Sequence, residues 1–309
     1  MRTYLDCIPC FIKSAIEMAR LVDGNEIRHK EIVDDVARLI PEFSLGCSPP
    51  EMARMIYKAM ARRYGDIDFY KNIKKQSNRA AMALYPRLKE KVRTSQDRLL
   101  TAVEIAIAGN VIDYAAKNTL NIEKEIEKIF TKDFNHINKT VFDYEAFKAE
   151  LDKSKRILYL ADNAGEIVFD RVFIEEIPFD KDIILAVRDK PVINDALIED
   201  AQECGLDKRA KVMSSGVDAP GTVLKYCSKE FIETYKSADI IISKGQGNYE
   251  ALSQERENIF FLFRAKCPVI ARHAQVALGD IVLKSLKMCG RVSQGISNPL
   301  FNTGMLKPD

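Results

Sequence analysis

Residues 156–166 read Arg-Ile-Leu-Tyr-Leu-Ala-Asp-Asn-Ala-Gly-Glu, and the fold class follows from their pattern. The segment opens with a short apolar run, typical of a strand that is buried on both faces, and turns polar where the strand would end. Four more such runs lie at 182–188, 211–215, 238–243 and 259–263, with segments of helical spacing between them. Buried strands that alternate with helices predict a mainly parallel, Rossmann-like sheet with helices on both faces, in three α/β/α layers.

The residues before this sheet carry helical signals only. Pro9 lies where a first-turn proline belongs, and Ser48 with Glu51 has the spacing of a capping box. An Asn-rich, polar segment then separates the helical half from the first strand. We expect an all-helical domain over residues 1–150, boundary segment included, followed by an α/β domain over residues 151–309.

Composition excludes several classes of partner. Among 309 residues, 47 are Lys or Arg and 45 are Asp or Glu, and no block of like charge separates the two halves. A dedicated nucleic-acid or acidic-membrane binder is therefore not expected. The apolar runs are too short to span a bilayer, the first residues lack the apolar core of a signal peptide, and the seven cysteines are scattered. We expect a cytoplasmic protein.

Oxygen donors follow the first two predicted strands. Asp162 and Asn163 come directly after the first strand, and Asp195 lies in the connection after the second. In a doubly wound sheet these connections meet at the carboxyl ends of the strands, where ligands bind. Two carboxylates and an amide suit a divalent cation such as Mg²⁺ or Mn²⁺. The sequence therefore predicts a metal site at this edge.

A second polar group at the same edge suits a phosphate. It comprises a lysine, glycine-flanked backbone, an amide and two hydroxyls: Lys244, Gly245, Gly247, Asn248, Ser214 and Ser215. A metal beside a phosphate indicates phosphoryl chemistry, in which the metal activates a water and a lysine neutralises charge on the phosphoryl oxygens. Either Glu166 or Asp218 would orient the water, and the sequence does not decide between them.

Each motif also has a purely structural explanation. Asn163 with Glu166 fits a capping box, and Asp195 fits an N-cap. Convergence on one edge favours the chemical interpretation, as does the position of Asp162, which capping does not require.

Other functional classes fit less well. In haloacid-dehalogenase-like phosphatases a second aspartate follows the nucleophile by two positions, and here that position is Ala164. Asp162 as a nucleophile stays open. A methyltransferase or oxidoreductase with a nucleoside cofactor should have a glycine-rich loop after the first strand, but Gly165 is the only glycine there. A non-catalytic sensor of a phosphorylated metabolite is the remaining alternative.

These motifs together resemble the metal-dependent damage-control phosphatases, formerly a domain of unknown function. The segments that carry the resemblance are CIPC (7–10), AGNVID (108–113), DNAGE (162–166), KPVIND (190–195) and KGQGNYE (244–250). The resemblance implies a helical domain joined to an α/β/α domain, with the metal held by Asp162, Asn163 and Asp195. It also implies hydrolysis of phosphomonoesters of small damaged or surplus metabolites, with Mn²⁺, Ni²⁺ or Co²⁺ preferred over Mg²⁺.

Two further pairs stand out. Asn110 and Asp113 share one face of a predicted helix and are either a buried polar pair or part of the substrate site. Cys7 and Cys10 resemble the Cys-x-x-Cys of the microbial subfamily, and their role is structural or redox-related. His273 follows the fifth strand and is expected to be a surface or core residue. The sequence predicts neither the natural substrate nor the oligomeric state.

Overall fold

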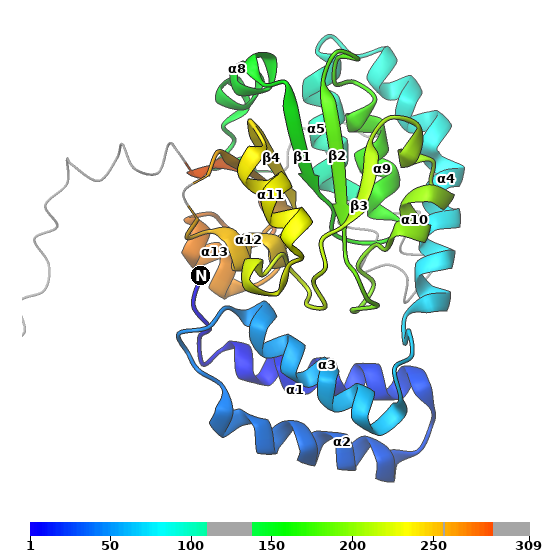
Figure 1. Cartoon of the computed structure of the whole chain (residues 1–309), viewed down its shortest axis with the longest axis vertical. Helices are drawn as coiled ribbons and strands as arrows, with labels where there is room; N and C mark the ends of the chain where they lie inside the picture. Colours follow the sequence, from blue (N-terminus) through cyan, green and yellow to red (C-terminus); the bar gives the residue numbers. More distant parts are fainter. Residues whose placement is uncertain (110–137, 256, 287–309) are drawn as a thin grey trace, which may run out of the picture.

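The computed structural model describes residues 1–109, 138–255 and 257–286, and its centre is one six-stranded sheet (Figure 1). The strand order is β3-β2-β1-β4-β5-β6, parallel except for β6, which pairs antiparallel with β5. The strands are β1 (Arg156–Leu160), β2 (Asp182–Val187), β3 (Lys211–Ser214), β4 (Ile240–Lys244), β5 (Ile259–Arg264) and β6 (Ile281–Ser285). The predicted mainly parallel sheet is confirmed, and β6 is an addition that the sequence pattern did not predict.

Helices cover both faces of the sheet and extend beyond its carboxyl edge. Their bounds are α1 (Cys7–Val22), α2 (Glu26–Leu39), α3 (Pro49–Tyr64), α4 (Lys71–Arg93), α5 (Arg98–Ala108), α8 (Tyr144–Lys153), α9 (Glu166–Ile174), α10 (Ile198–Glu203), α11 (Lys229–Ser237), α12 (Gln246–Leu252) and α13 (Pro268–Ala274). In the described part of the chain, no helix combines the length and apolar character that crossing a membrane requires.

The alternation of strand side chains builds two cores. Ile157 and Tyr159 belong to the cluster that α4, α5, α8 and α9 cover, whereas Leu158 and Leu160 belong to the cluster that α11, α12 and α13 cover. Side chains alternate between faces along a strand, so runs that are apolar at every position require helices on both sides. The predicted three-layer α/β/α architecture is confirmed.

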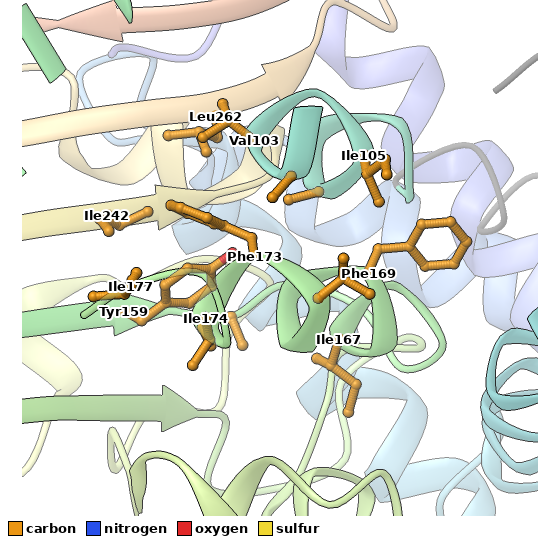
Figure 2. Close-up of a cluster of buried hydrophobic side chains, with 14 of the residues drawn as sticks. Val103, Ile105, Tyr159, Ile167, Phe169, Phe173, Ile174, Ile177, Ile242 and Leu262 are labelled. Atoms are coloured by element: carbon orange, nitrogen blue, oxygen red, sulfur yellow. The ribbon is translucent and has the colours of Figure 1, made fainter. Parts of the chain in front are cut away.

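The larger core joins α5 and α9 to the sheet. Figure 2 shows Phe173 of α9 between Val103 of α5 and the ring of Tyr159 on β1. The rings of Phe173 and Tyr159 lie 6.0 Å apart, and both side chains are fully buried. Burial of this kind contributes roughly 1.5–3 kcal/mol for each large side chain relative to exposure.

The N-terminal helices belong to two different cores. Helices α1, α2 and α3 share a cluster of their own, with Met18, Ile32 and Ile56 at its centre, and lie beyond the carboxyl ends of the strands (Figure 1). Leu88 of α4 and Val103 of α5 instead pack in the core of the sheet. By their packing, α4 and α5 belong with the sheet. The predicted domain boundary at residue 150 assigns both helices to the helical domain, and this boundary stays a prediction.

One predicted helix boundary agrees with the structure and two differ from it. The capping box of Ser48 and Glu51 is present at the start of α3, as predicted. Helix α10 begins at Ile198 instead of following directly from Asp195, so Asp195 is not its N-cap. The sequence pattern also predicts one continuous helix over residues 222–235, but in the structure Ser228 caps a new helix, α11, within that segment. Each difference lies in a connection, where local capping chemistry outweighs helical spacing.

Candidate metal and phosphate site

The connections after β1 and β2 run side by side at the carboxyl edge of the sheet. Asn163 and Asp195 form a short antiparallel bridge, and the carbonyl of Asp162 accepts a hydrogen bond of 2.8 Å from the amide of Ala196. All three predicted metal ligands therefore lie next to one another on a hydrogen-bonded backbone.

These three residues line one cavity of ≈ 210 Å³, called here the metal-site cavity. It lies between the sheet edge and helices α1 and α3, which cover it. The lining residues are Phe11, Pro49, Pro50, Ala53, Asp162, Asn163, Ile193, Asp195, Pro220, Gln246, Gly247, Glu250 and Lys266. The helical part and the sheet part of the chain therefore both line the candidate site.

Asp162 is held in a confined, electronegative position. Burial raises the pKa of its carboxyl group well above the usual value, and the charges of Glu166 and Asp195 raise it further, while Arg188 and Lys266 oppose the shift. A Cβ atom at Gly245 would overlap Asp162 Oδ2, so the backbone of Gly245 closes directly on the carboxylate. The φ of +80° at Gly245 also suits glycine alone.

A chain of buried contacts orients Asn163. Its side-chain amide donates to Asp162 Oδ2 at 2.8 Å and to Glu166 Oε2 at 3.0 Å. The other oxygen of Glu166 accepts from the ammonium group of Lys244 at 2.8 Å. Because the nitrogen of Asn163 is directed at two carboxylates, its carbonyl oxygen is the atom available to a cation.

Lys244 lies inside the molecule, with its side chain fully buried. Its ammonium group donates to the carbonyl of Ala106 at 2.9 Å, to Glu166, and to Asp170. Burial alone would lower the pKa of Lys244, but the Asp170 and Glu166 carboxylates outweigh it and raise the pKa. All three donors of the ammonium are used by the protein, and Lys244 does not line the metal-site cavity.

Arg188 fixes Asp195 from the other side. Its Nε donates to Asp195 Oδ2 at 2.6 Å, and its Nη atoms reach Thr222 and Asn248 at 3.1 Å. Asn248 also donates to the carbonyls of Ala161 and Lys244. Asn248 thus joins the ends of β1 and β4 through its side chain instead of facing the cavity.

The remaining predicted phosphate residues fall into two groups. Gly247 lines the metal-site cavity, and Gly245 lies beside it, with its amide donating to the carbonyl of Leu262 at 3.0 Å. Ser214 donates to Asp189 and Ser215 to the carbonyl of Val187, both at 2.8 Å, and neither serine lines the cavity. The structure brings the glycines to the site and leaves the two hydroxyls at the end of β3, outside the cavity.

Helix α4 supports the loop between β1 and α9. Asn78 accepts from the amide of Gly165 at 2.6 Å and donates to Asp200 at 2.8 Å, and all these contacts are buried. Gly165 has a φ of +78°, and a Cβ there would come within 2.8 Å of Ser77. The turn that presents Asp162 and Asn163 therefore depends on a helix that is distant in sequence.

Lys266 is a cavity-lining cation that the sequence motifs did not single out. It follows β5 and lines the same cavity as Asp162, whose pKa its positive charge lowers. Its position after a strand was visible in the sequence, but no spacing rule distinguished it from Lys244. Asp218, the alternative water-orienting residue, instead binds Arg54 with both carboxylate oxygens.

The other predicted residues lie at or outside the edge of the site. Cys7 and Cys10 are in the first turn of α1, both as free thiols, and burial raises the pKa of Cys7, with Cys267 and Cys10 among its neighbours. His273 accepts or donates a hydrogen bond of 2.9 Å with Tyr249. Asn110 and Asp113 lie outside the described residues.

The donor set fits a hard or borderline divalent cation. In the described ranges no group of three His, Cys, Asp or Glu residues surrounds one metal position, so an ion here would rely on the amide oxygen of Asn163 as well as on Asp162 and Asp195. Buried carboxylates that raise one another's pKa are stabilised by a bound cation, because the cation offsets their repulsion.

Comparisons with known proteins identify relatives over most of the chain. The model of the damage-control phosphatase ARMT1-like domain matches residues 3–282. A damage-control phosphatase of Pyrococcus horikoshii is 33% identical over 91% of this chain and 97% of its own length, and one of Archaeoglobus fulgidus is 33% identical over 90% and 97%. An uncharacterised protein of Methanocaldococcus jannaschii is 36% identical over 90% and 93%.

A solved structure has the same fold. The crystal structure of a DUF89 family protein from Pyrococcus horikoshii superposes with a TM-score of 0.82 at 30% identity, covering 92% of this chain and 99% of the other. Both the family model and the relatives span the helices over the site as well as the sheet. The chain therefore belongs to the damage-control phosphatase ARMT1-like family.

Proposed function

We propose that this protein is a metal-dependent phosphatase that hydrolyses phosphomonoesters of small metabolites. The observation that carries the proposal is the joint placement of Asp162, Asn163, Asp195 and Lys266 around one covered cavity. Oxygen ligands for a cation beside a lysine for an anion are what a phosphate ester requires. The relatives named damage-control phosphatases support the same reaction class.

Asp162, Asn163 and Asp195 would hold the cation. A mixed carboxylate and amide set accepts Mn²⁺, Ni²⁺, Co²⁺ and Mg²⁺. The family resemblance implies that one of the first three is the preferred ion and that Mg²⁺ is the weaker alternative. When bound, such an ion polarises a phosphoryl oxygen and acidifies water. Arg188 and Glu166 keep two of the ligands oriented through hydrogen bonds of 2.6 and 3.0 Å.

Lys266 takes the phosphate-binding role that the sequence motifs assigned to Lys244. Its side chain lines the cavity and lies near Asp162, so it can neutralise charge on the phosphoryl oxygens. The backbone of Gly247 forms part of the same wall. Lys244 instead acts as a positioning residue, which holds Glu166 and through it Asn163.

Phosphate release from an aryl phosphate tests this function. With added Mn²⁺, Co²⁺ or Ni²⁺ we expect turnover by the wild type, and a loss of more than about a hundredfold in Asp162→Asn, because a charged carboxylate ligand is replaced by a neutral amide. Asp182→Asn, at the exposed start of β2, is the matched control and should keep its activity. Equal phosphate release by the wild type and Asp162→Asn would contradict the site.

Thermal unfolding separates this function from the alternatives. The proposed enzyme should gain stability with Mn²⁺, and Asp162→Asn should not, since only a native-state site is linked to folding. Stabilisation by S-adenosylmethionine or NAD without any effect of divalent ions would favour a nucleoside-cofactor enzyme. Tight binding of a phosphorylated metabolite without turnover would favour a sensor. Its place in the cytoplasm stays a prediction.

A further inference from the structure

We propose that a second cavity beside the metal site holds the organic part of the phosphomonoester and selects substrates in which that part carries its own negative charge. This inference rests on the proposed function and names the substrate class for the same site. The second cavity, called here the side cavity, has a volume of ≈ 430 Å³. Its lining residues are Tyr57, Lys58, Ala61, Arg62, Asp66, Ile67, Phe69, Lys190, Pro191, Val192 and Asp218.

The side cavity and the metal-site cavity share two walls. Along α3, Ala53 lines the metal-site cavity, and Tyr57 and Ala61 line the side cavity. Residues spaced by four lie on one face of a helix, so a single face of α3 covers both cavities. In the loop after β2, Val192 lines the side cavity and its neighbour Ile193 lines the metal-site cavity.

Tyr57, which lines the side cavity, interacts electrostatically with Asp195 of the metal-site cavity. Burial raises the pKa of its hydroxyl group well above the usual value, and the charges of Tyr70 and Asp195 add to the effect. A residue of the side cavity is therefore within electrostatic range of a predicted metal ligand. The ester substituent of a phosphate held at the metal site would therefore extend along the shared face of α3 toward the side cavity.

The charges around the side cavity favour an anion. Lys58, Arg62 and Lys190 are exposed, and within the described ranges none of the three forms an ion pair. Asp218 does not offset them, because both of its carboxylate oxygens are bound by Arg54. Asp66 is the remaining acid of the lining. Three cations against one acid leave an excess of positive charge at the cavity mouth.

The lining of the side cavity also contains apolar groups, and a strained residue lies beside it. Tyr57, Phe69 and Val192 contribute two rings and an aliphatic group to the lining. Ile193 has a φ of +38°, which is unusual for a β-branched residue. Such strain persists where the surroundings fix the conformation, and here it directs adjacent side chains into two different cavities.

Two phosphomonoesters test the charge preference. Glycerol 3-phosphate has a neutral organic part, and 3-phosphoglycerate differs by one carboxylate. With Mn²⁺ we expect the wild type to prefer 3-phosphoglycerate in kcat/KM. The double variant Lys58→Gln/Arg62→Gln should reduce that preference about fivefold to tenfold, mainly through KM, because two cation contacts with the leaving group are lost.

A matched control separates local contacts from the charge of the whole protein. Lys71→Gln/Lys75→Gln removes two exposed lysines of α4 that line neither cavity, and it should keep the wild-type preference. A Lys58→Gln/Arg62→Gln preference equal to that of the wild type would overturn the inference. So would a wild type that hydrolyses both esters equally well.

Calorimetric binding of 3-phosphoglycerate to the metal-free protein tests the side cavity without turnover. Affinity should fall in Lys58→Gln/Arg62→Gln and not in Lys71→Gln/Lys75→Gln, and equal affinities in all three proteins would overturn the inference. If the wild type releases no phosphate from any ester with any of the metals, the proposed function fails, and the binding result still decides the side cavity.

Discussion

Gly245 shows how one backbone position can control the site. Its φ of +80° and the overlap that a methyl group there would have with Asp162 Oδ2 leave no room for a side chain. We expect Gly245→Ala to lower the free energy of unfolding by about 1–3 kcal/mol, because strain of this kind costs that much. Metal-dependent phosphate release should fall as well, because Asp162 must move.

Gly24 provides the control for that substitution. A Cβ at this exposed glycine would have nothing within 4 Å, and its φ does not lie in the left-handed range. Gly24→Ala should therefore leave urea unfolding and phosphate release at the wild-type level. The explanation for Gly245 is wrong if both alanine variants unfold at the wild-type urea concentration and keep full activity.

Lys244 and Lys266 should respond differently to substitution, because Lys244 is the buried last residue of β4 and Lys266 lies beyond the end of β5 in the cavity wall. Lys244→Met leaves Glu166 and Asp170 as buried carboxylates without their cation, and we expect a loss of about 3–5 kcal/mol in unfolding free energy. Lys266→Met should leave stability nearly unchanged and raise KM for the phosphoester. Urea unfolding and steady-state kinetics measure both effects.

A second substitution, at the buried Asp170 that pairs with Lys244, tests the explanation for the loss of stability. In Lys244→Met/Asp170→Asn one of the two unbalanced charges is removed, so part of the lost stability should return. Lys236→Met, on the exposed part of α11, should behave as the wild type. A Lys244→Met protein of wild-type stability that loses phosphate affinity would return Lys244 to the phosphate-binding role.

At the scale of the elements, Asp239 fixes where β1 and β4 begin. Its Oδ2 accepts from the amides of Lys155 and Arg156 at 2.9 and 2.8 Å, and these bonds lower the pKa of Asp239 to about 2. The pKa of Asp239 is lower in the folded protein than in the unfolded chain, so its ionised carboxylate stabilises the fold when the pH is above the unfolded-state pKa. This stabilisation is lost as the pH falls toward the folded-state pKa.

The pH dependence of Asp239→Asn follows from that sign. Near neutral pH the variant should be less stable than the wild type by about 1 kcal/mol, the usual net contribution of such hydrogen bonds. The difference should shrink as pH falls from about 4 to about 2, the interval between the unfolded and folded pKa values. Asp180→Asn, at an exposed acid, should show no such convergence in urea unfolding.

The sequence predicted the elements better than their partners. Strand runs such as 156–161 are apolar after their first residue, which requires helices on both faces of the sheet. The polar residues that follow such a run are placed at the end of that strand by the sequence alone. The helical signals before the sheet predicted helices there, but not that two of them, α4 and α5, would pack against the sheet. Tertiary partners of this kind are not encoded in local spacing.

The burial of Lys244 could have been predicted from the sequence, but the motif interpretation did not predict it. Ile240, Ile242 and Lys244 alternate along β4, so all three side chains point to one face, and the two isoleucines belong to the core beneath α5 and α9. That period of two predicts a buried lysine, whereas the motif interpretation treated it as part of a loop. Lys266, outside the end of β5, could not be distinguished without the fold.

At the scale of the whole molecule, the site exists because α1–α3 lie over the carboxyl edge of the sheet. The N-terminal amino group donates to the carbonyl of Glu250 in α12 at 2.5 Å, and Arg54 of α3 binds Asp218 in the loop after β3. Arg54 also lies 4.0 Å from the centre of the Tyr226 ring. These contacts link the helical cluster to the edge that carries the metal site.

Arg54→Ala tests whether this link positions the cover. The substitution removes two charge-assisted hydrogen bonds and a cation–π contact, and it frees the carboxylate of Asp218 in the side cavity. We expect faster amide hydrogen exchange in α1–α3, with protection of the sheet core nearly unchanged, because the helices keep their own core but lose an anchor. KM for phosphoesters should rise severalfold, in keeping with the loss of about 1 kcal/mol of positioning energy.

Arg38→Ala is the matched control, because Arg38 pairs with Asp35 at 2.8 Å on the exposed side of α2, away from the sheet. Its exchange and kinetics should match those of the wild type, since exposed pairs of this kind contribute little. If Arg54→Ala exchanges like Arg38→Ala and still loses activity, Arg54 acts on the substrate itself. If it keeps both exchange protection and KM, the apolar contacts of α3 alone hold the cover in place.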